Sequence, residues 1–562
     1  MRAMKRKLSL IVIILYLTSV LAGCGLGQSL YPFEHNIDGG IGSIEQDDDE
    51  PEIPAPKRGG ELIIPIPVPD TFNPLLTRSR DMINFFGLIF EGLFEYDENM
   101  RPQPCLVESW EVDEEGKLWR FHLRKDIKFH DGSILTGEDV VFTFIALQQG
   151  NLNSFFQKGI VGNDNIQKVE VDLFDIYTIN VHLLTPANNI LDIMTFPVLP
   201  KEIYQSDAYM LQKKEDTGLI PVGTGPYRVD EVMMDDGYIR LVRNSEWWGK
   251  QPYIDSILAK IYRDEMQVRQ AFRNGEVDLL DITSAITNPY LLDDSTRNYR
   301  YLTRNYEFLA FNLNHSILGD VNIRKAIAYA LQRKDIIFRV YLNNAEAVDV
   351  PIPSDSWLYD GNTRIYDFEQ EKAIKLLEEA GWTDSDGDGI REKDFDSKTV
   401  ELKFTIMTNA ENSIRKDVVE LIAQQLQEIG IGVQSRIVPW EEFETSLMDG
   451  NFEIVLTGYY LDIFPDLDFI FHSKFIGDGL NNFIRNRDEE LDMLLDEAAG
   501  IYQYDRLPES YSRIQKRIVE QLPVISLYFQ TAYLMTSNRV YGVEAPRELN
   551  IYRNIEDWYL HP

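Results

Sequence analysis

The 562-residue sequence has few cysteines and none of the common catalytic motifs. It contains no GxxxxGKS/T phosphate loop, no GxSxG elbow, no HExxH zinc site and no CxxC pair, which argues against enzymes built on those chemistries. The seven histidines are scattered, and His122 and His130 lie too far apart to be a metal pair on one helical face. Among 91 acidic residues, no spacing distinguishes a catalytic pair of carboxylates. No enzymatic activity is therefore expected.

Positive charge is also scarce. Lys and Arg number 55 against 91 Asp and Glu, and the formal net charge is −36. A balance of this sign repels nucleic acid and anionic lipid headgroups, so no nucleic-acid partner is expected. It is compatible with capture of cationic ligands, although many acidic proteins use their charge only for solvation.

The first 24 residues differ in character from the rest. MRAMKRK is basic, and the apolar run LSLIVIILYLTSV has the length of a signal-peptide core, below the roughly 20 residues of a membrane-spanning helix. LAGC follows and resembles the lipobox of bacterial lipoproteins, which implies a signal peptide over 1–23 and lipid, including palmitate, on Cys24. An ordinary signal peptide that happens to contain a cysteine is the alternative.

Two further features depend on that N-terminus. If Cys24 carries lipid, Cys105 is the only other cysteine, so an intramolecular disulfide is excluded. Residues 24–56 are rich in Gly, Pro and Asp and are predicted to be a flexible tether. The folded part is expected to begin near Lys57.

Strand-like and helix-like patterns alternate between residues 366 and 457. Strands are predicted at 401–407, 433–438 and 452–458, and helices at 366–381 (with Asp367 as N-cap), 411–429 and from Trp440. This alternation is typical of an open parallel sheet with right-handed crossovers, so the predicted fold class is α/β. Additional helices are predicted at 136–148, 264–274 and 320–332.

Residues 456–469, LTGYYLDIFPDLDF, place aromatic residues beside three aspartates at the end of a predicted strand. One interpretation is that the aromatics close the edge of the core while the acids solvate it. The other is a ligand pocket with aromatic walls, in which a carboxylate binds an ammonium group. Ligands bind open sheets outside the carboxyl ends of the strands, which favours the pocket.

The segment DSDGDGIRE at 384–392 resembles the start of a calcium loop. Asp384, Asp386, Asp388 and Gly389 match positions 1, 3, 5 and 6, but Phe395 stands at position 12, where such loops have a bidentate Glu. An Asp/Gly-rich turn is the favoured interpretation. No metal and no other cofactor is expected.

Seven segments resemble, in order, the family 5 extracellular solute-binding proteins, which are the oligopeptide, dipeptide and nickel receptors of ABC importers. The longest is CLVESWEVDEEGKLWRFHLRKDIKFHDGSILTGEDVVFTF at 105–144, and the others lie at 72–93, 221–229, 272–281, 321–336, 371–390 and 522–529. The resemblance covers nearly everything from about 57 to 562. It implies a periplasmic-binding-protein type II fold with two lobes and three domains, and a monomer that works with the permease subunits of an ABC importer.

The resemblance also implies a domain plan. Domain I would consist of 57–96, 221–310 and 528–562, and would form lobe one together with domain II at 97–220. Domain III at 311–527 would be lobe two. The hinge would be two chain crossings near 305–311 and 526–532, and its closure would enclose the ligand.

Site residues are implied in both lobes. In the family's peptide receptors, an aromatic residue, two spacers and an aspartate follow a strand of lobe two, and the aspartate accepts the ligand's α-ammonium group. Tyr459, Tyr460, Leu461 and Asp462 match that spacing, although many relatives have Trp where this chain has Tyr459, and Pro465 and Asp466 resemble the Pro-acid pair that follows. In lobe one, one loop matches the segment whose backbone pairs with an extended ligand. Its residues are Thr77, Arg78, Ser79, Arg80, Asp81 and Met82.

The implied function is capture of peptides by a lipid-anchored receptor on the extracytoplasmic face of the cell membrane. A cell-surface sensor of a peptide signal would need the same pocket, and relatives with this fold bind nickel complexes, haem or oligosaccharides. An extracellular hydrolase that uses cleft carboxylates is a further alternative, without a motif to support it.

Overall fold

The computed structural model describes residues 54–149, 152, 154–205, 219–283, 296–395, 398–477, 479 and 481–561. The chain divides into two units, 1–54 and 55–562, and every described helix and strand belongs to the second. Cys24, the predicted signal peptide and most of the predicted tether lie outside the described residues. Within the described ranges, no helix combines the length and apolar character needed to cross a membrane.

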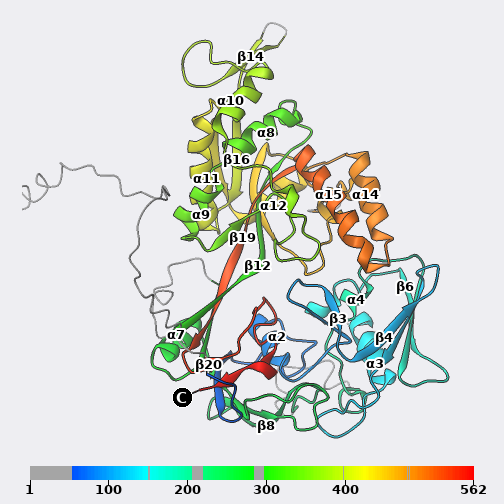
Figure 1. Ribbon diagram of the computed structural model, residues 1–562. Helices are drawn as coiled ribbons and strands as arrows, with labels where there is room; N and C mark the ends of the chain where they lie inside the picture. Colours follow the sequence, from blue (N-terminus) through cyan, green and yellow to red (C-terminus); the bar gives the residue numbers. More distant parts are fainter. Residues whose placement is uncertain are drawn as a thin grey trace, which may run out of the picture. The chain divides into compact units, whose positions relative to one another are not determined.

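Three larger sheets organise the described part of the chain (Figure 1). Their strand orders are β1-β10-β9-β8, β4-β5-β7-β6 and β11-β19-β12-β18-β16-β17, and β13 is attached to β19. The strands of the first two sheets are β1 (Glu61–Pro67), β8 (Tyr227–Met233), β9 (Tyr238–Arg243), β10 (Ser256–Tyr262), β4 (Val107–Val112), β5 (Leu118–Leu123), β6 (Ile166–Val171) and β7 (Thr178–Leu183). Those of the third are β11 (Leu279–Ile282), β12 (Thr296–Phe311), β13 (Ala345–Ala347), β16 (Lys403–Asn409), β17 (Gly432–Val438), β18 (Ile454–Tyr460) and β19 (Val524–Ser537). Short two-stranded pairs join β2 (Phe94–Tyr96) to β3 (Pro102–Pro104), β14 (Glu392–Phe395) to β15 (Lys398–Glu401), and β20 (Val540–Tyr541) to β21 (Tyr559–Leu560).

The third sheet is mixed. β16 pairs in parallel with both β17 and β18, which confirms the three strands and the parallel arrangement predicted from the alternating pattern. β18 and β19, in contrast, both run antiparallel to β12. The antiparallel half was not predicted, because its strands come from distant parts of the chain.

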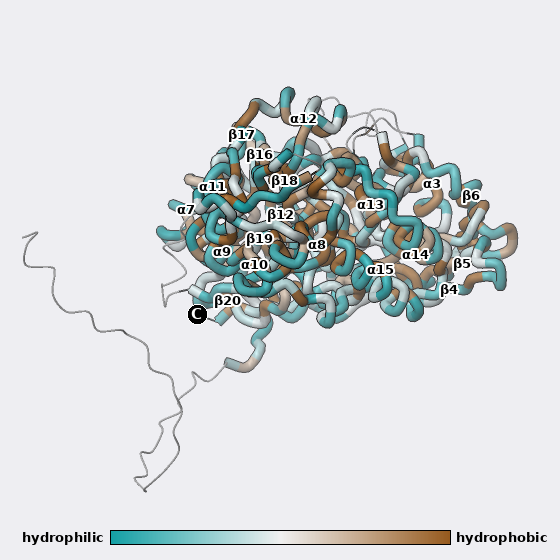
Figure 2. Tube along the Cα trace, turned by 90° about the horizontal axis from the view of Figure 1, so that it is seen from above, coloured by the Kyte–Doolittle hydropathy of each residue, from teal (hydrophilic) through white to brown (hydrophobic). Residues whose placement is uncertain are grey.

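The predicted helices are confirmed with small shifts at their ends. They are α3 (Gly137–Gln149), α7 (Glu265–Arg273), α8 (Val321–Ala330), α10 (Gln370–Glu379), α11 (Ser413–Gln427) and α12 (Trp440–Asp449). The other α-helices described are α2 (Arg80–Phe86), α4 (Ile190–Ile193), α5 (Lys201–Tyr204), α9 (Arg333–Tyr341), α13 (Asp468–Phe471), α14 (Glu489–Ala499) and α15 (Leu507–Gln521). Figure 2 shows hydrophobic and hydrophilic positions alternating along α11 and α14, as expected for helices that bury one face.

One predicted helix cap is wrong. Asp367 does not cap α10, which begins at Gln370 after Glu369 and has no side-chain cap. The preceding segment is held outside the helix, because the backbone of buried Tyr366 is hydrogen-bonded to other elements. Its N–H donates to Asp349 at 3.3 Å, and its carbonyl accepts from the guanidinium of Arg333.

Among the strands that the structure describes, β12 and β19 are the longest, with 16 and 14 residues. They run side by side from the region of α7 and β20 to the sheet beside α8 and α11 (Figure 1). Their register shifts between Leu302 and Tyr306, and again between Glu307 and Phe308. Both predicted hinge crossings lie within these two strands, and their action as a hinge stays a prediction.

Candidate ligand-binding site

The end of β18 is fixed by a close approach of three chain segments. A Cβ atom on Gly458 would lie 2.6 Å from the carbonyl oxygen of Tyr306 and 2.7 Å from both Glu307 Oε1 and Arg415 Nη2. Glu307 and Arg415 are joined by two hydrogen bonds of 2.9 Å. Glycine at this position therefore lets β18 lie against a largely buried ion pair and places the following loop.

The loop after β18 lines a cavity of about 260 Å³. All four residues predicted in this segment, Tyr459, Tyr460, Asp462 and Asp466, contribute to its wall, together with Lys158. The Tyr459 ring stacks on Phe308, with centroids 5.4 Å apart, and meets Phe469 edge-on at 5.2 Å. The Tyr459 ring thus packs against the core, as the first interpretation expects, and the loop also borders a cavity. Ligand binding in that cavity stays a prediction.

The two aspartates of this loop and Asp468, which begins α13, have different surroundings. Asp462 has a side chain that is 32% exposed and forms an ion pair with Lys158. Asp466 accepts the N–H of Asp468 at 3.0 Å, and burial raises the pKa of its carboxyl group, as does nearby Asp468. Asp468 pairs with Lys474 at 2.7 Å. Asp462 and Asp468 are thus each paired with a lysine, whereas the carboxyl pKa of Asp466 is raised by burial.

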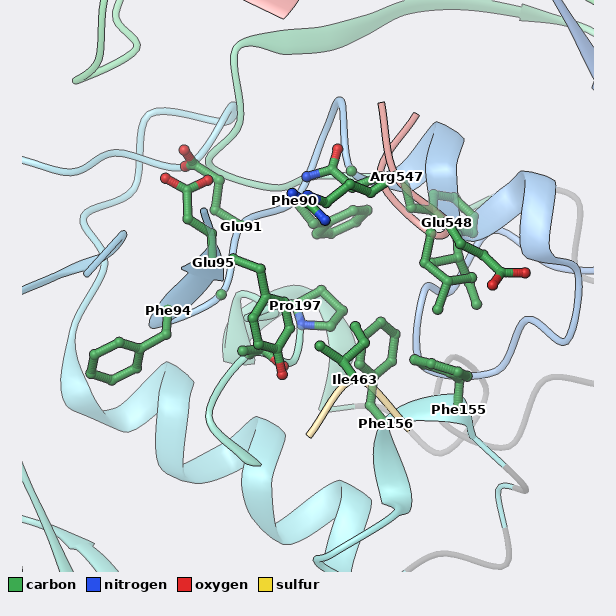
Figure 3. Close-up of a pocket in the computed structure, with 18 of the residues that line it drawn as sticks. Phe90, Glu91, Phe94, Glu95, Phe155, Phe156, Pro197, Ile463, Arg547 and Glu548 are labelled. Carbon is green, nitrogen blue, oxygen red and sulfur yellow. The ribbon is translucent and has the colours of Figure 1, made fainter. Parts of the chain in front are cut away.

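A second cavity, of about 210 Å³, is lined in part by Ile463 of the same loop (Figure 3). Most of its wall is apolar and aromatic, with polar groups from three acids and two arginines. The aromatic residues are Phe86, Phe90, Phe94, Tyr96, Phe155 and Phe156, and the charged residues are Glu91, Glu95, Arg304, Arg547 and Glu548. Sequence reasoning did not find this cavity; its one local signal is the aromatic-rich run from Ile83 to Tyr96.

Arg304 connects the two cavities. Its guanidinium lies 4.3 Å from the ring centroid of Tyr460 and 5.3 Å from that of Phe155, and it donates a hydrogen bond to the Tyr460 hydroxyl. The Arg304 backbone N–H donates to buried Glu548 at 2.7 Å. Arg304 lies in β12 between Leu302 and Tyr306, where the pairing of β12 with β19 shifts register. The shift in register therefore lies at a residue that contacts the lining of both cavities.

Glu91 is an acid on the wall of the second cavity whose two carboxylate oxygens both accept hydrogen bonds from indole groups. Burial raises the pKa of its carboxyl group to about 7, even though two indole groups donate hydrogen bonds to it. Trp247 Nε1 and Trp248 Nε1 lie 3.0 and 3.1 Å from its oxygens. Both oxygens of Glu91 are thus bound within the protein, which favours a structural role.

The lobe-one segment predicted to pair with a ligand is only partly extended. Arg80, Asp81 and Met82 form the first turn of α2, and Ser79 is its N-cap, accepting the N–H of Met82 at 3.3 Å. The N–H of Arg78 donates to Asp70 at 2.9 Å, and that of Ser79 to Thr77 Oγ1 at 3.2 Å. Arg80 binds Asp281 at 2.5 Å and, with Asp81, lines a separate cavity of about 200 Å³. Thr77 and Met82 are buried.

The calcium-like loop forms a turn stabilised by its own side chains. Carboxylate oxygens of Asp384, Asp386 and Asp388 lie within 4.8 Å of one another, and all three residues are exposed. Asp384 accepts the N–H groups of Gly387 and Gly389, at 2.8 and 3.1 Å. Glu392 accepts the N–H of Ser385 at 2.7 Å. These contacts agree with the interpretation as an Asp/Gly-rich turn.

Solved structures match this arrangement over most of the chain. HbpA2 from Haemophilus parasuis aligns with a TM-score of 0.75 and 21% identity, covering 90% of this chain and all of that one. AppA from Bacillus subtilis, solved in complex with a nonapeptide, aligns with a TM-score of 0.60 and 26% identity, covering 90% of this chain and all of that one. The fold and the cavities after β18 define a two-lobed binding protein of the periplasmic type II class.

The sequence comparison is more specific. The model of the bacterial extracellular solute-binding proteins, family 5, middle region, matches residues 101–482. The chain therefore belongs to family 5 of the bacterial extracellular solute-binding proteins, the substrate-binding proteins of ABC importers.

Curated relatives match over nearly their whole length. The oligopeptide-binding protein AppA of Bacillus subtilis is 28% identical over 519 residues, 90% of this chain and 92% of that protein. The dipeptide-binding protein of Escherichia coli is 26% identical over 498 residues, 84% of this chain and 90% of that protein.

Proposed function

We propose that this protein captures peptides between its two lobes and delivers them to the permease subunits of an ABC importer. The observation that carries the proposal is Asp462, whose carboxylate stands at the end of β18 on the wall of an aromatic-lined cavity. The names of its relatives, an oligopeptide-binding and a dipeptide-binding protein, support peptides as the ligand class.

In the proposed complex, Asp462 accepts the α-ammonium group of the peptide. Hydrogen bonds between ionised groups are about twice as strong as neutral ones, so this contact would fix the register of the ligand. The second cavity is lined in part by Ile463 of the same loop, and its aromatic wall suits an apolar side chain of the ligand. The segment Thr77–Met82 is proposed to contact the peptide backbone, mainly through its non-helical part, Thr77–Ser79.

The remaining parts of the proposal concern the whole receptor. Domain I (57–96, 221–310 and 528–562) and domain II (97–220) would form lobe one, domain III (311–527) would form lobe two, and β12 and β19 would act as the hinge. Lipid on Cys24 would hold the receptor, as a monomer without enzymatic activity, on the extracytoplasmic face of the cell membrane.

Native mass spectrometry of the purified protein tests the ligand class. Closure of two lobes around a ligand slows its release, so a fraction of the protein is expected to retain bound molecules from the expression host. The expected masses are those of short peptides, released by denaturation and identified by fragmentation. Recovery of only a haem, a nickel complex or an oligosaccharide would contradict the proposed ligand class.

A further inference from the structure

Lys158 lies against the carboxylate that is proposed to bind the peptide's amine. Its Nζ atom forms an ion pair with Asp462 Oδ2, and both residues line the cavity that follows β18. A lysine side chain ends in a primary ammonium group with three N–H donors, as does the free N-terminus of a peptide. The cavity therefore already holds a group of the kind its proposed ligand would bring.

The backbone that carries Lys158 is well anchored. Lys158 follows the short 3-10 helix η1 (Phe155–Gln157), which a capping box between Ser154 and Gln157 stabilises. Gln157 Nε2 also donates to the carbonyl oxygen of Leu147 in α3, at 2.9 Å. The start of the Lys158 side chain thus has a defined position next to Phe155 and Phe156, which line the second cavity.

The Lys158 side chain itself is free to leave. It is 68% exposed, and ion pairs with such exposure are weak because water and salt screen them. The four-carbon stem of lysine is also flexible. A ligand ammonium group could take the place of Lys158 on Asp462 without unfolding any part of the site.

We propose that Lys158 is an internal substitute for the peptide's amine, which occupies Asp462 in the ligand-free protein and is displaced by the ligand. This inference rests on the proposed function above and adds a specificity-determining residue to it. A ligand with a free amine has to displace Lys158 from Asp462, whereas a ligand without a positively charged group leaves the ion pair in place, so Lys158 lowers the affinity for free-amine ligands alone. It also neutralises Asp462 while the cavity is without ligand.

The test compares binding of a synthetic tetrapeptide, AFAA, with a free or an acetylated N-terminus by isothermal calorimetry. Lys158→Met keeps an unbranched apolar side chain and removes the competing ammonium group. The variant is expected to bind the free-amine peptide more tightly than the wild type, by up to about fivefold, because an exposed ion pair no longer has to be broken. Affinity for the acetylated peptide should not change.

Two further variants isolate the effect. Lys168→Met removes a similarly exposed lysine, which pairs with Glu170 on β6, and should leave the affinity for both peptides unchanged. In an Asp462→Asn background, Lys158→Met should no longer raise the affinity for the free-amine peptide, because the carboxylate for which the two ammonium groups compete is gone.

Weaker or unchanged binding of the free-amine peptide by Lys158→Met would overturn the inference. Weaker binding would show that Lys158 contacts the ligand instead of competing with it. Both results leave peptide capture intact as long as the wild type binds peptide. If the wild type binds neither AFAA nor any co-purified peptide, the proposed function itself fails.

Discussion

At the scale of single residues, the cavity after β18 depends on Gly458. No larger residue fits there, because the backbone of Tyr306 and the ion pair between Glu307 and Arg415 occupy the space that a Cβ atom would need. The pair is largely buried, with side-chain exposures of 5% and 11%. Removing or displacing one partner of such a pair leaves an uncompensated charge in a poorly hydrated place.

Gly458→Ala should therefore destabilise the protein. The added methyl group has to push apart backbone and a buried ion pair, at a cost of about 1–3 kcal/mol in the free energy of unfolding. A lower urea midpoint, followed by circular dichroism, is the expected result. Gly361→Ala is the matched control, because its Cβ would find no atom nearer than 4.0 Å. Equal midpoints for the two variants would contradict the close approach.

At the scale of elements, α4 and the segment around Tyr504 meet through the partly buried carboxyl group of Asp192. Asp192 of α4 accepts hydrogen bonds from the hydroxyls of Tyr504 and Tyr96, at 2.9 and 3.1 Å. Tyr504 also stacks on Trp357, with ring centroids 6.0 Å apart. Burial raises the pKa of Asp192 to about 7, although both tyrosine hydroxyls favour its charged form. The segments that meet here belong to the two proposed lobes.

The raised pKa predicts a pH dependence of stability. The folded protein binds the Asp192 proton more tightly than the unfolded chain does. The stability that the bound proton contributes is therefore fully present below about pH 4 and is lost as the pH rises towards 7. Asp192→Asn does not titrate, so relative to the wild type it should gain stability between pH 4.5 and 7.5. A difference on the order of 2–4 kcal/mol is expected from urea midpoints at the two pH values.

Asp505→Asn is the control for that prediction, because it removes an exposed carboxylate next to the same contact. It should follow the wild-type pH dependence. If Asp192→Asn also followed the wild type at both pH values, the partly buried carboxyl group would not titrate in this range, and the interpretation of the contact would be wrong.

Local patterns predicted the elements better than their assembly. The strands β16, β17 and β18 and their parallel pairing follow from apolar periodicity within 60 residues of sequence. The antiparallel pairing of β12 with β19 could not be predicted from such patterns, because it joins segments more than 200 residues apart. The second cavity could not be predicted for the same reason, because residues as far apart in the sequence as Phe90 and Glu548 line it together.

Only the part of the site that is contiguous in the sequence was predicted. Tyr459 and Tyr460 end β18, and Asp462 and Asp466 follow in the next loop. Their spacing in the sequence therefore carried the information, and the structure brings them to one cavity. Lys158 reaches that cavity from the segment that follows η1, far from this loop in the sequence, and left no local signal. The helical start of α2 could have been predicted, since Ser79 with Asp81 in the first turn is a typical N-terminal pattern.

At the scale of the whole molecule, the proposed mechanism depends on a hinge between two lobes, a cleft that encloses the ligand and one carboxylate that binds it. β12 and β19 connect the proposed lobes, Arg304 ties the break in their register to both cavities, and the loop after β18 supplies Asp462. Family 5 membership defines the class of protein, whereas the choice of ligand depends on these residues. The central claim is that Asp462 accepts the amine of a bound peptide.

Calorimetry on Asp462→Asn tests that claim most directly. The substitution keeps the shape of the side chain and removes its charge, so binding of free-amine AFAA should weaken by about 2–5 kcal/mol, the usual cost of removing one partner of a desolvated charge pair. The N-acetylated peptide, which cannot form the pair, should bind the wild type and the variant alike. Equal affinities of the two proteins for the free-amine peptide would contradict the role of Asp462.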